Sequence, residues 1–235
     1  MMFGTVSVSE NERIREENEM KTYAITIARG FGSGGREIAS RLADELGIHS
    51  YENRILTLAA QYSGRDEQDF VEVDERLRGT YLTSQLRRLQ KRLVPVPQKK
   101  AFSSDDRLFE FQTKIIRELV MAESCIIVGK CADYVLKDFD NVLSVYIEAP
   151  RSFCLQRVMK RMGVSEPEAH EMIHNTDKYR AEYYRYYTRG NYWTNPVNYD
   201  LTLNNGRLGD DRSIEIIKSA LRVKCPWAFA GGLEG

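Results

Sequence analysis

Apolar residues recur along this chain with two periods, one typical of strands and the other of helices. Residues 23–28 form a short run rich in β-branched side chains that glycine closes, which predicts a strand. From Gly35 the apolar positions follow helical spacing, and Gly47 ends this second segment. Residues 48–51 predict another short strand. A glycine-rich turn therefore joins the first strand to the first helix.

The same alternation continues to the end of the chain. Further strands are expected over residues 125–128, 142–147 and 199–203, and helices over residues 53–62, 109–122, 151–162, 177–187 and 214–221. Ser165 and Glu168 have the spacing of a capping box, which predicts the start of a helix. Strands that alternate with helices imply a mostly parallel sheet covered by helices on both faces.

Two segments do not fit this alternation. Residues 65–100 are more polar and behave as part of an insertion outside the main sheet. Residues 1–22 place their charges after a weakly apolar start, the reverse of a signal peptide, and are expected to form a flexible tail. The remaining residues, 23–235, are expected to form a single domain.

Composition excludes several classes of function. The 34 basic residues balance 34 acidic ones, which argues against non-specific binding to nucleic acid. No apolar run approaches the length that a membrane span requires. The four cysteines show no C-x-x-C spacing, so they are expected to be free thiols in a reducing cytoplasm.

The turn RGFGSGGRE, residues 29–37, fits two templates for phosphate binding. Gly30, Gly32 and Gly35 match the dinucleotide fingerprint. Gly30 and Gly35, followed by Arg36 and Glu37, instead have the spacing of a P-loop. In both, bare main-chain N–H groups at a helix N-terminus point at an anion.

Three other residues bear on the choice between these two templates. Glu52, twenty residues after Gly32, supplies the carboxylate that the dinucleotide template needs. Arg36, just inside the helix, supplies a permanent positive charge for phosphate and favours the P-loop. Glu37 cannot copy the hydroxyl that binds Mg²⁺ in a P-loop, but it can bind the metal directly or through water, or cap the helix. A tight turn without a ligand is the third reading.

The second half of the chain carries two more patterns. His170 to His174 match H-E-x-x-H, although a solvated helix face explains this short pattern better than a zinc protease does. Arg157 and Arg161 are four residues apart and share one helix face, where they would neutralise a phosphoryl group or simply be solvated. The tyrosines of residues 178–199 either pack on the core or stack on a base.

Several stretches in the same order resemble the cytidylate kinase-like family of P-loop nucleoside monophosphate kinase relatives. They are AITIARGFGSGGREIASRLADELGI, IIVGKCADYVLKDFDNV, NTDKYRAEYYRYYT and NYDLTLN. The resemblance implies an α/β P-loop kinase fold, a three-layer sandwich with a five-stranded parallel sheet. It also implies a helical monophosphate-binding insertion near residues 52–100 and an arginine-bearing lid near residues 155–195.

The resemblance also assigns site residues. It places the donor phosphates on the loop formed by Gly32, Ser33, Gly34, Gly35, Arg36 and Glu37. Lys130 and Asp133 match an element that faces the acceptor nucleotide, with Lys130 where arginine is usual. Asp177 and Arg180 fit a D-x-x-R element that touches the acceptor.

The leading expectation is a cytoplasmic nucleotide kinase that uses ATP and Mg²⁺, with CMP or dCMP as the acceptor and small nucleotides as its partners. Charge neutralisation by Arg36, Arg157, Arg161 and Arg180 would supply the catalysis, and no metal-binding residue set is expected. A non-catalytic nucleotide-binding protein, a kinase of another small acceptor and an NAD(P)-dependent oxidoreductase remain as alternatives. The acceptor and the oligomeric state stay open.

Overall fold

The computed structural model describes residues 22–52 and 106–229 of the chain. The strands are β1 (Ala24–Arg29), β2 (His49–Tyr51), β3 (Cys125–Val128), β4 (Val142–Glu148) and β5 (Leu201–Asn204). The helices are α2 (Gly35–Leu46), α6 (Asp106–Ala122), α7 (Ala132–Val135), α8 (Arg151–Met162), α9 (Glu166–Tyr187), α10 (Asn205–Leu208) and α11 (Asp210–Lys224). Two 3₁₀ turns, η1 (Pro196–Asn198) and η2 (Pro226–Phe229), complete the described elements.

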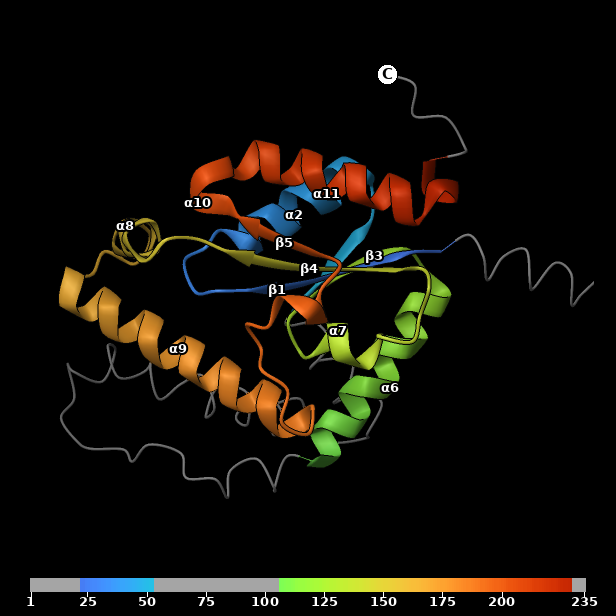
Figure 1. Ribbon diagram of the computed structural model, residues 1–235, viewed down its shortest axis with the longest axis horizontal. Coiled ribbons are helices and arrows are strands. Elements are labelled where there is room, and N and C mark those ends of the chain that lie inside the picture. Colours follow the sequence, from blue (N-terminus) through green and yellow to red (C-terminus); the bar gives the residue numbers. More distant parts are fainter. Residues whose placement is uncertain (1–21, 53–105, 230–235) are drawn as a thin grey trace, which may run out of the picture.

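The five strands form one parallel sheet in the order β2-β3-β1-β4-β5. In Figure 1, α2 and α11 cover one face of this sheet, whereas α6 and α7 lie on the other. The predicted three-layer α/β sandwich with a five-stranded parallel sheet is therefore confirmed. The strands β2 and β3 lie on one side of β1, and β4 and β5 lie on the other. The strand order therefore changes direction at the central strand β1. Ligands of open parallel sheets bind at such a point, beyond the carboxyl ends of the strands.

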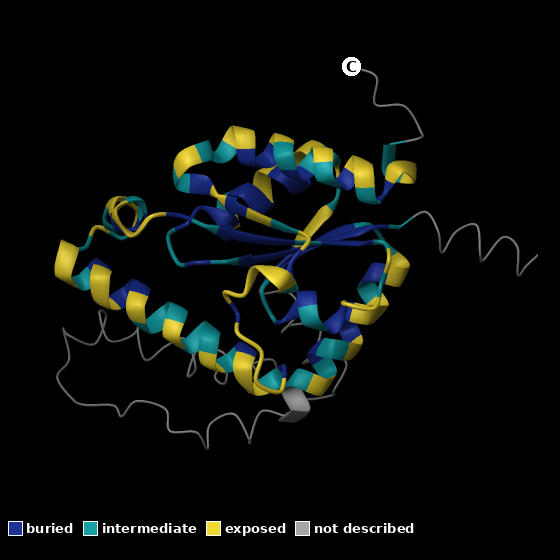
Figure 2. Cartoon of the chain, in the orientation of Figure 1, coloured by how far each residue is buried: buried dark blue, intermediate teal, exposed yellow. Residues whose placement is uncertain are grey.

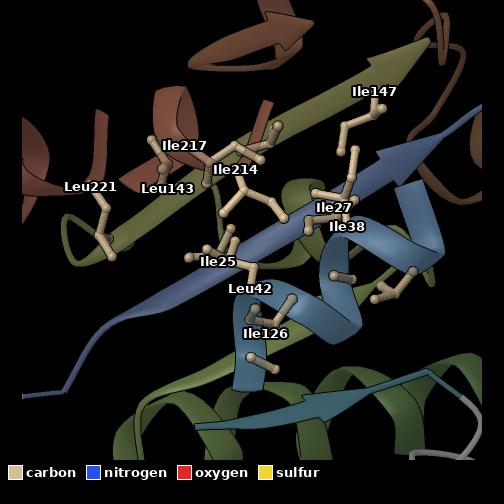
Figure 3. Packing of buried hydrophobic residues seen from close by; sticks show 14 of the residues in the cluster. Ile25, Ile27, Ile38, Leu42, Ile126, Leu143, Ile147, Ile214, Ile217 and Leu221 are labelled. Atoms are coloured by element: carbon tan, nitrogen blue, oxygen red, sulfur yellow. The ribbon is translucent and has the colours of Figure 1, made fainter. Parts of the chain in front are cut away.

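Alternation along the buried strands places their side chains in separate clusters on the two faces of the sheet. Ile25 and Ile27 of β1 pack with Ile38 and Leu42 of α2 and with Ile217 of α11. Figure 3 shows these side chains meeting between the two helices and the sheet. The intervening strand residues face the other layer and pack with α6 and α7; they include Ala24, Cys125 and Ile127. The central strands β1, β3 and β4 are consequently buried on both faces, as Figure 2 shows.

Most predicted elements agree with the structure to within a few residues. The helix over residues 151–162 and the strand over residues 125–128 have the predicted bounds. The capping box of Ser165 and Glu168 is present, and α9 continues from it without a break through residues 177–187. The last strand begins at Leu201, later than predicted. The predicted helix over residues 53–62, nearly all of the insertion and residues 1–21 of the tail lie outside the described residues.

Candidate active site

The glycine loop between β1 and α2 has a backbone that few side chains tolerate. Gly32 and Gly34 have φ values of +86° and +93°, in the left-handed region. A Cβ atom on Gly34 would lie 2.5 Å from Nδ2 of Asn205. The loop ends at the N-terminus of α2, where the first N–H groups of a helix have no partner within it. These amides and the helix dipole form a seat for an anion.

Hydrogen bonds from buried polar side chains fix the conformation of the loop. The Ser33 side chain is fully buried, and its hydroxyl donates to the Gly30 carbonyl over 2.9 Å. Asn205 donates from Nδ2 to the Ser33 carbonyl over 2.8 Å, and its Oδ1 accepts from Ser213 over 2.9 Å. Ser33 therefore shapes the loop from inside, and its side chain does not face a ligand.

Arg36 turns toward the end of β2. Its Nε lies 2.9 Å from Oε2 of Glu52, while Nη2 of Arg29 donates to Oε1 of the same carboxylate over 2.6 Å. Glu52 and Arg29 are mostly buried, whereas the Arg36 side chain is 63% exposed. One carboxylate thus joins two guanidinium groups beside the glycine loop, and the more exposed one can still reach a phosphate.

Glu37 pairs with the arginines of α8. Its Oε1 accepts from Nη1 of Arg161 over 2.8 Å, and Nη2 of Arg157 lies 3.7 Å from Oε2. Arg157 also lies 3.2 Å from Asp210 at the start of α11. The structure therefore brings both predicted lid arginines to the first turn of α2, although they are 120 and 124 residues from Glu37 in the chain.

Asp177 and Arg180 tie α9 to the glycine loop. Oδ1 of Asp177 accepts from the Phe31 N–H over 2.8 Å and from Nη1 of Arg180 over 3.2 Å. Arg180 also donates to the Arg29 carbonyl over 2.9 Å. Burial raises the pKa of Asp177, and the nearby Arg180 opposes this rise. Asp177 therefore contacts protein groups, whereas Arg180 lies at the edge of the cavity described below.

The turn after β3 presents Lys130 and Asp133. Gly129, Lys130 and Cys131 all have φ between +53° and +74°, and a non-glycine residue in this region costs about 1–3 kcal/mol. Asp133 is only 7% exposed, and its Oδ2 accepts from the Tyr184 hydroxyl over 2.7 Å. Burial raises the pKa of Asp133 to about 6, although the hydrogen bond from Tyr184 opposes the rise.

A cavity of about 780 Å³ lies between these elements. Most of the residues predicted to bind or catalyse line it: Gly32, Gly34, Gly35, Arg36, Glu37, Lys130, Asp133, Arg161 and Arg180. Arg157 lines a second hollow of about 420 Å³, which shares Gly32, Glu37 and Arg161 with the first. Ser33 and Asp177 do not line either of these spaces. Aromatic side chains also line the first cavity, among them Tyr179, Tyr183, Tyr184 and Trp193.

Sequence reasoning missed two charged residues of this region. Arg29 ends β1 and lines the cavity. Glu148 ends β4 beneath the loop, where a Cβ atom on Gly30 would collide with its carboxylate. Burial raises the pKa of Glu148, as does the charge of Asp177. Both residues stand at the carboxyl ends of central strands, and this position is the signal that would have found them.

Two alternative readings of the sequence gain no support from the geometry. In a dinucleotide-binding half the second strand lies beside the first, but here β2 pairs with β3, and Glu52 is engaged by two arginines. His170 and His174 lie exposed on α9. Within residues 22–52 and 106–229, no three His, Cys, Asp or Glu side chains cluster closely enough to hold a metal ion. In the same residues, no helix is long and apolar enough to cross a membrane.

The residues of the cavity fit a nucleotide that carries Mg²⁺ on its phosphates. The glycine loop at the start of α2 suits a polyphosphate, because the main-chain N–H groups at a helix N-terminus attract an anion. Mg²⁺ usually keeps several waters and takes one or two carboxylates together with substrate phosphates. Glu37, which lines the cavity, is a carboxylate that would reach such a phosphate-bound ion directly or through water. The residues therefore fit a metal ion that arrives with the nucleotide.

Comparison with known proteins identifies the family. A crystal structure of an uncharacterized protein from Eubacterium ventriosum aligns with a TM-score of 0.61 at 25% identity, covering 85% of this chain and 98% of its own. A cytidylate kinase of Methanopyrus kandleri is 26% identical over 209 residues, which cover 84% of this chain and 92% of that protein. A cytidylate kinase of Thermococcus sibiricus is 33% identical over 121 residues, covering 49% and 59% respectively. Because the family model matches residues 24–207, the chain belongs to the cytidylate kinase-like family.

Proposed function

We propose that this protein transfers the γ-phosphoryl group of ATP to a small phosphate-bearing acceptor, with CMP or dCMP as the leading candidate. One observation carries the proposal: cationic side chains from five segments of the chain converge on one cavity beside the glycine loop. They are Arg29, Arg36, Lys130, Arg161, Lys178 and Arg180. Phosphoryl transfer needs this arrangement, because catalysis there consists mainly of positioning and charge neutralisation.

The chain's own residues would divide the work between donor and acceptor. Main-chain N–H groups of the glycine loop and the start of α2 hold the donor phosphates, and Arg36 and Arg161 neutralise the charge on the transferred group. Lys130 and Arg180 hold the acceptor phosphate, and Arg180 also neutralises charge on the transferred group. Mg²⁺, when bound with the nucleotide, would neutralise phosphate charge and orient the transferring group.

The cavity also suits a planar acceptor. Tyr179, Tyr183 and Trp193 line it, and aromatic side chains stack on nucleobases irrespective of sequence. Asp133 adds a carboxyl group that can accept hydrogen bonds when ionised or donate one when protonated. These groups suit a nucleoside monophosphate, and the cytidylate kinases among the relatives make the cytosine base the first to test.

The proposal is tested by incubating the purified protein with ATP, Mg²⁺ and a panel of CMP, dCMP, UMP and AMP while ADP is measured. We expect ADP to appear only with a subset of acceptors. Arg36→Ala should lower kcat/KM by about 10²-fold or more, because a preorganised charge at the transferring group is lost. Arg212→Ala, an exposed arginine of α11 outside the cavity, serves as the control and should have no effect. An absence of acceptor-dependent ADP would refute phosphoryl transfer to these monophosphates.

A second candidate is a nucleotide-binding protein that does not transfer phosphate. It is favoured by the two residues that depart from the P-loop pattern, because Arg36 is paired with Glu52 and Glu37 with Arg161. Calorimetry with ATP separates the candidates. Tight ATP binding without turnover for any acceptor supports this second function, whereas turnover with one acceptor excludes it.

A further inference from the structure

Phe31 lies in the glycine loop, and two arginines from the helices across the cavity lie over its ring. The guanidinium carbon of Arg161 is 5.6 Å from the ring centroid, and that of Arg180 is 5.7 Å away. Both distances fall within the range of about 6 Å over which cation–π attraction acts. Arg161 belongs to α8 and Arg180 to α9, so one loop side chain contacts cations from two helices.

The loop itself fixes the position of this ring. The Phe31 N–H donates to Asp177 over 2.8 Å, which holds its backbone against α9. Its half-buried side chain packs against the apolar cluster between α8 and α9, which includes Leu155, Met172 and Ile173. The ring is therefore anchored by contacts that do not involve either guanidinium group.

Both arginines are long side chains whose ordering costs free energy. An arginine side chain carries considerable rotamer entropy, part of which is lost when its guanidinium is fixed. Arg161 is otherwise held by Glu37, and Arg180 by Asp177 and the Arg29 carbonyl. These partners accept hydrogen bonds from the guanidinium groups, whereas the ring of Phe31 contacts both groups through cation–π attraction. The ring therefore limits the motion of both arginines.

We propose that Phe31 is a positioning residue: its ring holds Arg161 and Arg180 together at the phosphate site before substrates bind. The kinetic consequence rests on the proposed phosphoryl transfer, whereas the geometric claim does not. The effect is expected in kcat more than in KM, because arginines that neutralise the transferring group act in the transition state.

The geometric claim is tested by NMR of the arginine Nε–Hε groups. A ring beneath a guanidinium shifts its proton signals upfield, so the signals of Arg161 and Arg180, assigned with Arg161→Lys and Arg180→Lys, should be upfield in the unmodified protein. Phe31→Leu should return both toward the values of exposed arginines, whereas Phe31→Trp should not. Signals that are already at exposed values in the unmodified protein would overturn the inference, whether or not the protein is a kinase.

The kinetic claim is tested in the phosphotransfer assay. Two cation–π contacts of about 0.5–1 kcal/mol each correspond to a loss in kcat of roughly fivefold to thirtyfold for Phe31→Leu, with a smaller change in KM for ATP. Phe31→Trp should retain most of the rate. Val164→Ala removes apolar packing from the same cluster without touching the cavity and controls for general loosening. Equal rates for the Leu and Trp variants would refute the kinetic role. If the unmodified protein transfers no phosphate, the proposed function fails and the NMR result alone decides the inference.

Discussion

At Gly34 the glycine loop packs closely against the buried amide of Asn205. The variant Gly34→Ala tests whether this close packing is needed for the loop to bind phosphate. Its φ of +93° costs a non-glycine residue about 1–2 kcal/mol. The new methyl group would also lie 2.5 Å from Nδ2 of Asn205, which donates to Ser33 and Asp210. Weakening these two hydrogen bonds costs about 1–2 kcal/mol more. We expect the free energy of unfolding to fall by about 2–4 kcal/mol in total.

Gly47→Ala is the matched control. Gly47 also has a positive φ, of +64°, but an added Cβ atom there would meet nothing within 4 Å. This variant should therefore lose only the backbone part, about 1–2 kcal/mol, and should bind ATP as the unmodified protein does. Urea unfolding followed by circular dichroism gives both values. If the two variants were destabilised equally and bound ATP equally well, the close packing of Gly34 would have no role in the site.

Three further predictions concern charged groups around the cavity and the core. Burial raises the pKa of Asp133 to about 6, so its contribution to stability is present below about pH 4 and is lost as the pH rises to about 6. The stability difference between the unmodified protein and Asp133→Asn should therefore shift over this range by about 3 kcal/mol in favour of the variant, as urea unfolding at several pH values can show; a constant difference would contradict it. Glu37→Gln removes a carboxylate that competes with phosphate for Arg161, so ATP without Mg²⁺ should bind about twofold to fivefold more tightly by calorimetry. Weaker binding in the variant would show that Glu37 positions the arginines instead. Burial alone would raise the pKa of Asp200, but hydrogen bonds from Lys224 and Ser144 outweigh it and lower the pKa. Asp200→Asn should cost about 1 kcal/mol at pH 7, a cost that disappears as the pH falls through the lowered pKa, and an unchanged cost in acid would refute the assignment.

The sequence predicts the bounds of an element well where proline or glycine stands at its ends. The helix over residues 151–162 was placed correctly because Pro150 precedes it and Gly163 ends it in the left-handed conformation. The predicted start of the last strand is too early, because Tyr199 is an aromatic residue close to the apolar strand residues that follow it. In the structure Tyr199 closes a 3₁₀ turn, and its hydroxyl donates to the Trp193 carbonyl over 2.7 Å. A buried loop residue and a strand residue look alike in the sequence.

The arrangement of the site depends on contacts between residues far apart in the chain, and the sequence alone does not reveal them. The glycine loop was recognisable from its spacing, because its conformation is local. The pairing of Arg36 with Glu52 depends on where β2 lies, and that follows from the strand order of the whole sheet. The same holds for Arg161 with Glu37, which joins two helices far apart in the chain. Family resemblance placed the predicted residues near one another, but it gave neither their ionic partners nor the contribution of Arg29.

The proposed function requires that main-chain amides of the glycine loop, together with Arg36, bind polyphosphate. Titration of ¹⁵N-labelled protein with ATP, observed through the amide signals of Gly32, Gly34 and Gly35, tests it directly. We expect these signals to shift and saturate together. Arg36→Ala should weaken the affinity for ATP by about tenfold or more, because a charge-assisted contact with phosphate is lost. Signals that stay unchanged while ATP saturates the protein would place the nucleotide elsewhere and would rule out the glycine loop as the phosphate site.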